Sequence, residues 1–354
     1  MSKPKVAIVH DWLVGGGAEK VVEALHQMYP DAPIYTSYAS TEWQEKLNNK
    51  VVTGYLQSWP FSKLRKFIPF LRIWWFESLD FSDYDLVISS SGAEAKGIKT
   101  GEHTLHVNYC HAPTHYYWSR YDEYLKNPGF GVFDPLARFG LKLLVGPLRK
   151  WDYKAAQRPD KIIANSTYTK RKIKQYYGRD SVVIFPPVDT KRFKQKTNVK
   201  RRGFVIAGRQ TPYKRFDLAV KACTTLNLPL LVLGDGPEHS KLKEMAGPSI
   251  TFRSWVSDQE VADAFQSADG YIFPGIDDFG IAPVEALTAG CPVIAYKDGG
   301  VLDYVVPGKT GDFFEKPNAE SLAKALTDFK PWVVAKLPID VTPSHFKEQL
   351  RKQL

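Results

Sequence analysis

Short apolar runs recur along this chain, and each is followed by a polar turn and then by a segment with helical spacing. Nearly continuous apolar runs of this length predict strands of a parallel sheet, because helices cover both faces of such a sheet. The predicted strands lie in residues 5–13, 85–91, 106–110, 161–167, 182–187, 203–208, 228–236, 250–255, 270–275 and 292–296. Helical spacing is clearest in residues 18–29 and 215–226. This alternation predicts an α/β fold of two doubly wound, Rossmann-like domains that face each other across a cleft.

The alternation lapses in a lysine-rich segment with two adjacent prolines, near residues 186–202. We therefore expect an N-terminal domain over residues 1–190 and a C-terminal domain over residues 191–336. A last helix is predicted within residues 337–354, where it can cross back to the N-terminal domain or stay with the second one. Parallel sheets bind ligands beyond the carboxyl ends of their strands, so functional residues are expected just after the strands.

Composition narrows the class of protein. The 354 residues are 44% hydrophobic and 13% aromatic, which suits ordinary packed cores. The three cysteines are scattered without metal-ligand spacing, which favours a reducing compartment. The first residues lack the apolar core of a signal peptide, and charged residues interrupt the longest apolar stretches before they reach the roughly 18 residues of a membrane span. A cytoplasmic location is predicted.

The formal net charge is +10, and the positive charge is clustered. Residues 191–202 contain seven basic residues and no acidic one, and a solvated face is the favoured interpretation there. Residues 59–76 mix cations with bulky aromatic residues and also lack an acid. The cations of this second run are Lys63, Arg65, Lys66 and Arg72. Such a mixture is typical of interfacial segments, so contact with an anionic membrane at the inner face of the plasma membrane and plain burial are both open.

Three glycines, Gly15 to Gly17, follow the first predicted strand and precede a helix. Glycines allow close backbone approach, and the N-terminus of the helix favours an anion, so a phosphate is the natural ligand. A tight structural turn is the alternative. The spacing differs from the dinucleotide-binding pattern, because Lys20 stands where a third glycine is needed, and no Gly-Lys-Ser/Thr of a Walker loop follows. An NAD-dependent oxidoreductase is therefore disfavoured.

Two cations flank one turn in the second half of the chain. Arg209 follows the predicted strand 203–208, and Lys214 precedes the helix 215–226. A planar guanidinium and a compact ammonium at one strand end suit a diphosphate.

Two histidines, His111 and His115, follow the predicted strand 106–110 at the spacing of a helical metal pair. Pro113 lies between them, and no glutamate stands where a zinc protease keeps its base, so metal binding is disfavoured. His111 at the strand end can hydrogen-bond a substrate hydroxyl, whereas His115 is interpreted as structural or exposed.

The stretch 275–296 places carboxylates around the start of a helix. The turn delivers the backbone N–H groups of Phe279, Gly280 and Ile281 to the strand end, and Asp277 and Glu285 flank that cradle of amides. Carboxylates accept hydrogen bonds from sugar and ribose diols, and amides bind diphosphate. A nucleotide-sugar has polyols at both ends and an anion in the middle, so it matches this arrangement.

The residues resemble a known family. Residues 277–295 resemble the Glu, seven residues, Glu signature of the retaining glycosyltransferases of family 4, which have the GT-B two-domain fold. Seven further segments match that family in order, and the likeness covers nearly the whole chain. They are GGGAEK, YCHAPTHYYW, IANSTYTKRKIKQYYG, VIFPPVD, GRQTPYK, LGDGPE and GGVLDYVVPGKTG. Within the family, the chain is most similar to mannosyltransferases that use GDP-mannose to build bacterial surface polysaccharides.

The resemblance implies roles for the catalytic residues. Glu285 would bind the donor ribose, and Asp277, which stands where the family usually has glutamate, would lie near the hydroxyls of the transferred sugar. Arg209 and Lys214 would stabilise the diphosphate leaving group, and His111 would contact the donor sugar.

The same resemblance implies that Gly16 and Gly17 approach the diphosphate and the acceptor, and that the backbone of Val256 meets the nucleotide base. The N-terminal domain would bind the acceptor and the C-terminal domain the nucleotide-sugar.

The implied function is retaining transfer of a hexose from a GDP- or UDP-linked donor to a glycan or lipid-linked acceptor, with no metal and no cofactor. Nucleic acid is not an expected partner. A GT-B nucleotide-sugar epimerase and a basic nucleic-acid-binding protein are the alternatives; the second explains the charge but not the carboxylates at strand ends.

Overall fold

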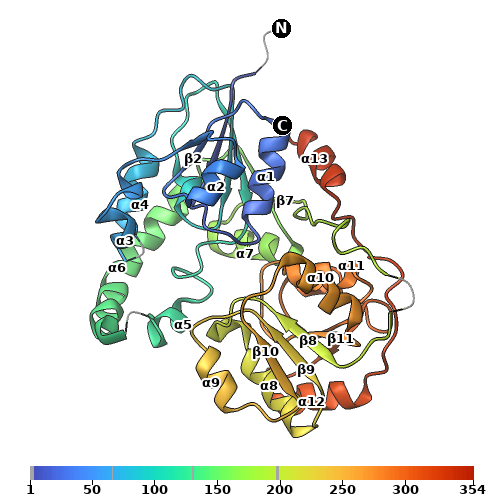
Figure 1. Cartoon of the computed structure of the whole chain (residues 1–354). Coiled ribbons are helices and arrows are strands. Elements are labelled where there is room, and N and C mark those ends of the chain that lie inside the picture. Colours follow the sequence, from blue (N-terminus) through green and yellow to red (C-terminus); the bar gives the residue numbers. More distant parts are fainter. Residues whose placement is uncertain (1–3, 66, 130, 197–198) are drawn as a thin grey trace. The chain divides into compact units, whose positions relative to one another are not determined.

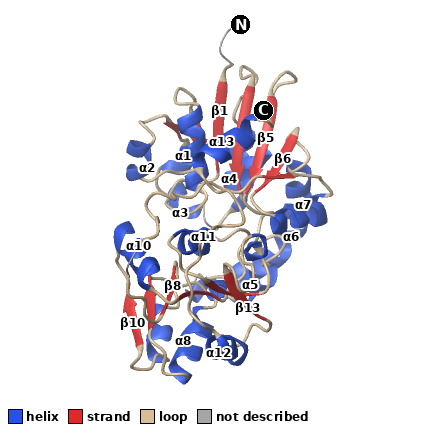
Figure 2. Cartoon of the chain, turned by 90° about the vertical axis from the view of Figure 1, so that its right-hand side faces the viewer, coloured by secondary structure: helices blue, strands red, loops and turns tan. Residues whose placement is uncertain are grey.

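The computed structural model describes residues 4–65, 67–129, 131–196 and 199–354 (Figure 1). The chain divides into two compact units, Met1–Pro187 together with Ser344–Leu354, and Val188–Pro343. Each unit contains one parallel β-sheet with helices on both sides (Figure 2).

The sheet of the first unit has seven strands in the order β3-β2-β1-β4-β5-β6-β7, and neighbouring strands are parallel. The strands are β1 (Val6–His10), β2 (Ile34–Thr36), β3 (Val51–Val52), β4 (Leu86–Ser91), β5 (Leu105–Cys110), β6 (Lys161–Ala164) and β7 (Val182–Val183). The five apolar runs predicted in this half each coincide with one strand to within a residue or overlap it fully, whereas the short strands β2 and β3 were not predicted.

Helices connect these strands. They are α1 (Glu19–Met28), α2 (Thr41–Lys46), α3 (Phe61–Leu64), α4 (Pro69–Glu77), α5 (Tyr121–Lys126), α6 (Asp134–Ala155), α7 (Thr167–Tyr177) and α13 (Pro343–Arg351). Three 3₁₀ turns join them: η1 (Tyr55–Gln57), η2 (Glu94–Gly97) and η3 (Gly131–Phe133).

Alternate residues of β1 face opposite sides of the sheet, so each side has its own core. Ile8 packs in one cluster with Leu25 of α1 and Phe346 of α13, whereas Val9 packs in another with Phe76 of α4. The C-terminal helix α13 therefore belongs to the first unit, although the second unit separates it from the rest in sequence.

The sheet of the second unit has six parallel strands in the order β10-β9-β8-β11-β12-β13. The strands are β8 (Phe204–Ala207), β9 (Leu230–Leu233), β10 (Ile250–Arg253), β11 (Gly270–Phe273), β12 (Val293–Tyr296) and β13 (Gly311–Phe314). The helices are α8 (Phe216–Thr225), α9 (His239–Glu244), α10 (Asp258–Ser267), α11 (Ile281–Thr288) and α12 (Ala319–Asp328), with 3₁₀ turns η4 (Pro212–Lys214) and η5 (Gly300–Asp303). Of these strands, β13 was not predicted.

In both sheets, the order in which successive strands are added reverses at one place. In each, the first strand of the unit (β1 or β8) lies beside the fourth (β4 or β11), and the chain winds outward on either side. Helices on opposite faces leave a crevice beyond the carboxyl ends at such a switch point, and ligands of doubly wound folds bind there. The predicted class of two Rossmann-like units is confirmed, and it assigns one candidate site to each unit.

Candidate active site

The switch point of the second unit brings two predicted residues together. The turn η4 carries Lys214 after β8, and Asp277 follows β11, the strand beside it. The ammonium nitrogen of Lys214 lies 3.3 Å from a carboxylate oxygen of Asp277, and about a fifth of each side chain is exposed. A cation and a carboxylate that are 63 residues apart in sequence thus meet at the sheet edge where ligands are expected.

Backbone packing allows this approach. A Cβ built on Gly275, two residues before Asp277, would lie 2.8 Å from the Cα of Lys214. That distance is shorter than real side chains tolerate, so only glycine lets the loop after β11 pass so close to η4.

The amide cradle predicted at residues 279–281 is the start of α11. Gly280 has φ +83°, which favours glycine, and α11 begins at Ile281. The hydroxyl of Tyr304 donates to the carbonyl oxygens of Phe279, at 2.7 Å, and Gly280, at 3.1 Å. In a trans peptide the carbonyl and the next N–H point in opposite directions, so the N–H groups of Gly280 and Ile281 point away from Tyr304. They belong to the helix N-terminus, where an anion is favoured.

Glu285 lies four residues after Ile281, hence one turn into α11, and only 8% of it is exposed. Its carboxylate and that of Asp277 act on one side chain, Tyr271 of β11. Burial raises the pKa of the Tyr271 phenol, and both carboxylates raise it further, because they disfavour a phenolate beside them. Both acids therefore act on the same buried hydroxyl.

The remaining predicted residues of this unit lie at the same edge of the sheet. Arg209 lies two residues after the end of β8, and its side chain is exposed. Within the described part of the chain, its guanidinium has no hydrogen-bond or ion-pair partner. Val256 lies half-buried in the loop between β10 and α10. Its neighbour Trp255, which sequence reasoning missed, is 91% exposed.

The first unit places Gly16 and Gly17 in an exposed loop between β1 and α1. Glu19 of α1 holds this loop by hydrogen bonds. Its buried carboxylate accepts from the N–H groups of Val14, at 3.3 Å, and Gly15, at 3.0 Å. The two glycines thus stay at the surface.

His111 follows β5, and its Nε2 lies 2.7 Å from the hydroxyl oxygen of Ser90 at the end of β4. The backbone carbonyl of Ser90 lies 2.7 Å from Nδ1 of His10 at the end of β1. The three strand ends around the first switch point are thus linked by polar contacts. Sequence reasoning missed Ser90 and His10, although their place at strand ends could have drawn attention to them.

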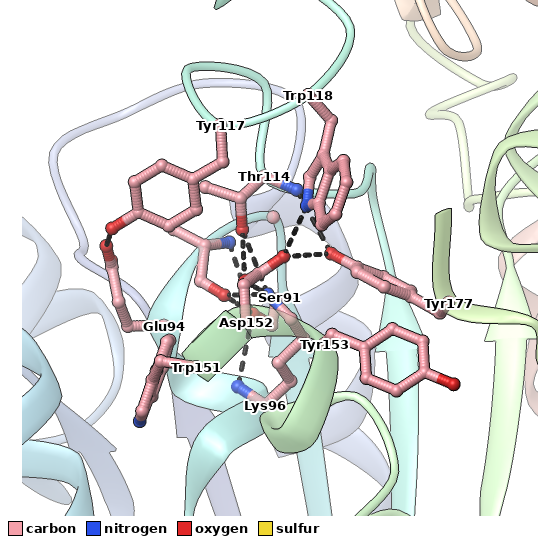
Figure 3. A network of polar contacts seen from close by, with 12 residues as sticks. Ser91, Glu94, Lys96, Thr114, Tyr117, Trp118, Trp151, Asp152, Tyr153 and Tyr177 are labelled. Atoms are coloured by element: carbon pink, nitrogen blue, oxygen red, sulfur yellow. Dashed lines mark hydrogen bonds and ion pairs between the residues drawn. The ribbon is translucent and has the colours of Figure 1, made fainter. Parts of the chain in front are cut away.

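The loop after His111 is held by a buried ion pair that the sequence did not reveal (Figure 3). The ammonium of Lys96 lies 2.6 Å from the carboxylate of Asp152 on α6, and almost nothing of either side chain is exposed. Burial alone would lower the pKa of Lys96, but the Asp152 carboxylate raises it above its usual value.

Asp152 also accepts hydrogen bonds from three residues that surround it in Figure 3. The donors are the hydroxyl of Thr114 (2.8 Å), Nε1 of Trp118 (2.8 Å) and the hydroxyl of Tyr177 (2.7 Å). Two of these donors belong to the segment directly after His111, so the ion pair fixes the course of that segment.

The cations of residues 59–76, for which surface contact and burial were both open, lie partly in the interior. Arg72 is 5% exposed and makes a two-pronged ion pair with buried Glu94, at 2.8 and 2.9 Å. Arg65 is also buried, with its guanidinium over the ring of Tyr38. Lys63 is exposed, and Lys66 lies outside the described residues. Of the two alternatives left open for this run, burial holds for the two arginines, because each has a partner inside the unit.

The second basic run is a solvated face with acidic partners. Arg192 and Lys196 form ion pairs with Asp258 and Asp263 of α10. Such exposed pairs add little stability but lower the positive potential that nucleic acid would need.

Two findings concern the described residues as a whole. Among residues 4–65, 67–129, 131–196 and 199–354, no group of three or more His, Cys, Asp or Glu side chains is arranged to hold a metal ion. Within the same ranges, no helix is both long and apolar enough to cross a membrane.

Comparison with known families decides the class. A family model described as Glycosyltransferase Family 4 matches residues 15–192, which is just over half of the chain. The chain belongs to glycosyltransferase family 4. A second model, described as Glycosyl transferases group 1, matches residues 187–330 of this family 4 member.

Two curated relatives are similar over part of their length. The D-inositol 3-phosphate glycosyltransferase of Streptomyces avermitilis is 27% identical over 205 residues, which cover 48% of this chain and 44% of that protein. The GDP-mannose-dependent alpha-(1-6)-phosphatidylinositol monomannoside mannosyltransferase of Mycolicibacterium smegmatis is 24% identical over 200 residues, which cover 48% of this chain and 52% of the relative. The chain spans about half the length of the curated relatives it matches.

Among solved structures, HepE of Anabaena in complex with UDP-glucose is similar with a TM-score of 0.65 at 18% identity, covering 92% of this chain and 89% of that one. This likeness shows the fold, which is GT-B as the sequence resemblance predicted.

Proposed function

We propose that this chain is a retaining hexosyltransferase that moves a hexose, with mannose as the first candidate, from a nucleoside diphosphate sugar to a glycan or lipid-linked acceptor. The observation that carries the proposal is the meeting of Lys214 and Asp277 at the switch point of the second unit, with Glu285 one turn into the adjoining helix. Cation, carboxylates and helix N-terminus match the anionic middle and the polyol ends of such a donor.

In the proposed complex the donor lies along the carboxyl edge of the sheet. Glu285 accepts hydrogen bonds from the ribose diol, and Asp277 faces the hydroxyls of the transferred sugar. Lys214, Arg209 and the first amides of α11 bind the diphosphate, and the backbone of Val256 meets the base. Because Lys214 is paired with Asp277 in the free protein, the arriving diphosphate shares this cation and leaves the carboxylate for a sugar hydroxyl.

The chemistry proposed follows from where charge develops. When the bond between the anomeric carbon and the phosphate oxygen breaks, its electron pair leaves with the diphosphate, and the sugar ring gains positive character. Lys214 and Arg209 are placed to stabilise the departing charge, in the role that a metal ion plays elsewhere. The acceptor hydroxyl attacks the face from which the diphosphate leaves, and its proton passes to the departing phosphate oxygen, so the anomeric configuration is retained.

Donor and acceptor are proposed from the relatives. The M. smegmatis relative is named for GDP-mannose and for a phosphatidylinositol-linked acceptor, which supports GDP-mannose as the donor to test first and a lipid-linked acceptor at a membrane surface. Gly16, Gly17 and His111 of the first unit are proposed to serve the acceptor and the transferred sugar.

A panel of GDP-, UDP- and ADP-sugars tests this proposal. A bound donor at about 100 times its Kd should stabilise the fold by about 2.7 kcal/mol, which thermal unfolding detects. The stabilising donor is then incubated with and without polyprenyl-linked glycan acceptors, and products are followed by mass spectrometry.

Transfer that requires the acceptor supports the proposal. Conversion of the sugar without an acceptor would instead identify an epimerase. If no nucleotide-sugar stabilises the chain while duplex DNA binds with a steep salt dependence, the protein is a nucleic-acid-binding one.

A further inference from the structure

The first half of α6 exposes apolar side chains that the fold does not use. Leu136, Phe139 and Leu143 are 69%, 66% and 65% exposed. Their spacing of three and four residues places them on one face of the helix. Just before the helix, Val132 and Phe133 are 88% and 65% exposed. We call these five exposed residues the α6 stripe: three lie on the first half of α6, the green helix of Figure 1, and two lie just before it.

The opposite side of the same helix packs normally. Leu144 and Leu148 lie in a cluster with Phe70 and Ile73 of α4. Phe70 lies beside Trp74, with ring centres 6.4 Å apart, and Trp74 is 62% exposed. The helix is thus anchored on α4 through the side that faces away from the exposed residues. The α6 stripe is therefore not the face through which α6 joins the hydrophobic core of this unit.

The charges around the α6 stripe are positive. Residues 127–150 contain Arg138, Lys142, Arg149 and Lys150 but only one acid, Asp134. Arg138 and Lys142 are exposed and lie one residue from apolar positions of the stripe, whereas Asp134 is half-buried. Asp122 and Glu123 are exposed on α5, which packs against α6, and are the nearest acids in the preceding helix.

This composition suits one kind of partner. A helix with aromatic and aliphatic residues on one face and cations beside them lies in the headgroup region of an anionic membrane. Residues 134–145 span only about 18 Å, too short to cross the apolar core of a bilayer but enough to lie along its surface. A second copy of the chain fits less well, because the cations beside the stripe would face the same cations, and interface cores are poor in charged residues.

We propose that the α6 stripe is a docking surface that inserts between the headgroups of an anionic membrane. This deepens the membrane part of the proposed function, and it moves the contact from the cations of residues 59–76 to α6. Docking does not require sugar transfer, so the two proposals can fail separately. The chain can transfer sugar without binding vesicles, and it can bind vesicles without transferring sugar.

The test uses the full chain and vesicles of phosphatidylcholine with and without phosphatidylglycerol, in a sedimentation assay. The triple variant Leu136→Ser, Phe139→Ser, Leu143→Ser should lower the partition coefficient onto phosphatidylglycerol vesicles at least about tenfold, since three apolar side chains no longer insert. A matched variant with Tyr153→Ser, Val182→Ser and Val333→Ser, which are also exposed, should bind like the wild type. Arg138→Gln with Lys142→Gln should weaken binding only to vesicles that contain the anionic lipid.

A second measurement does not depend on loss of binding. The three native cysteines are buried, so Leu143→Cys can be labelled selectively with an environment-sensitive fluorophore. Its emission should shift to shorter wavelength when vesicles are added, and a label on Val333→Cys should not respond. The proposal is overturned if wild type ignores the vesicles, if the triple variant binds as well as wild type, or if the label at position 143 stays in water. It is also overturned if light scattering shows a dimer that the triple variant abolishes without any vesicle binding by wild type.

Discussion

Replacing Lys96 by methionine tests whether the buried ion pair holds the first unit together. Methionine is also unbranched and ends where the lysine ammonium begins, so the variant removes little more than that ammonium. The ammonium lies 2.6 Å from the Asp152 carboxylate and 2.9 Å from the hydroxyl of Thr114. Asp152 keeps hydrogen bonds from Thr114, Trp118 and Tyr177, yet its negative charge stays buried without a cation. Breaking a buried pair in this way costs about 3–5 kcal/mol. That is a large part of the stability of a typical domain, about 5–15 kcal/mol.

The assay is urea unfolding followed by tryptophan fluorescence and fitted with two transitions, because the chain has two units. Lys99→Met is the control: Lys99 is exposed, its ammonium lies 3.7 Å from Glu77, and such surface pairs contribute about 0–1 kcal/mol. The double variant Lys96→Met, Asp152→Asn has no unpaired charge at this buried position, so it should be less destabilised than the sum of the single variants.

The pH dependence of this effect has a defined sign. The folded pKa of Lys96 is raised above its unfolded value, so the stabilisation is fully present below the unfolded pKa of about 10.4 and is lost only as the pH rises through the folded value. The effect of Lys96→Met should therefore be the same at pH 6 and pH 8. An effect below about 1 kcal/mol, or strict additivity in the double variant, would refute the reasoning.

Three further predictions concern the site and the fold. Glu285→Gln keeps the shape of the side chain but removes the negative charge of the carboxylate that is proposed to accept hydrogen bonds from the ribose. The affinity for nucleoside diphosphate and nucleotide-sugar, measured by calorimetry, should therefore drop several-fold, while the melting temperature stays near that of wild type. Early melting with unchanged affinity would make Glu285 a structural helix residue. Transfer should survive EDTA, because Arg209 and Lys214 are proposed to take the role of a metal ion; loss of transfer that magnesium or manganese restores would contradict this. Burial lowers the pKa of His106 to about 3, whereas a histidine of the unfolded chain has a pKa of about 6.5. The unfolded chain therefore takes up the proton first as the pH falls, and stability should fall by up to about 1.4 kcal/mol per pH unit below about pH 6. His106→Gln should flatten that slope relative to wild type, and an unchanged slope would show that other groups cause the acid sensitivity.

Much of the candidate site could be predicted from sequence because strand ends are local features. Arg209, Lys214 and Asp277 each follow an apolar run, and in a parallel sheet all carboxyl ends meet at one edge. The strands β2, β3 and β13 were missed for a physical reason as well. β2 and β3 have only three and two residues. β13 (Gly311–Phe314) is as long as the other strands of its unit, but it includes a glycine and an aspartate, so the apolar pattern that marks a strand is weak there.

The sequence by itself determined the two doubly wound units, the order of their strands along the chain and the chemical nature of the residues after each strand, because hydrophobic spacing and turn residues act over a few positions. Only the tertiary structure decided which distant groups pair. It brought Lys214 to Asp277 across neighbouring strands, and it buried Arg72 against Glu94 although both are charged. It also left the apolar side chains of α6 in solvent. Such outcomes depend on which neighbours share a low-dielectric interior, and no local pattern of hydrophobic and polar residues contains that information.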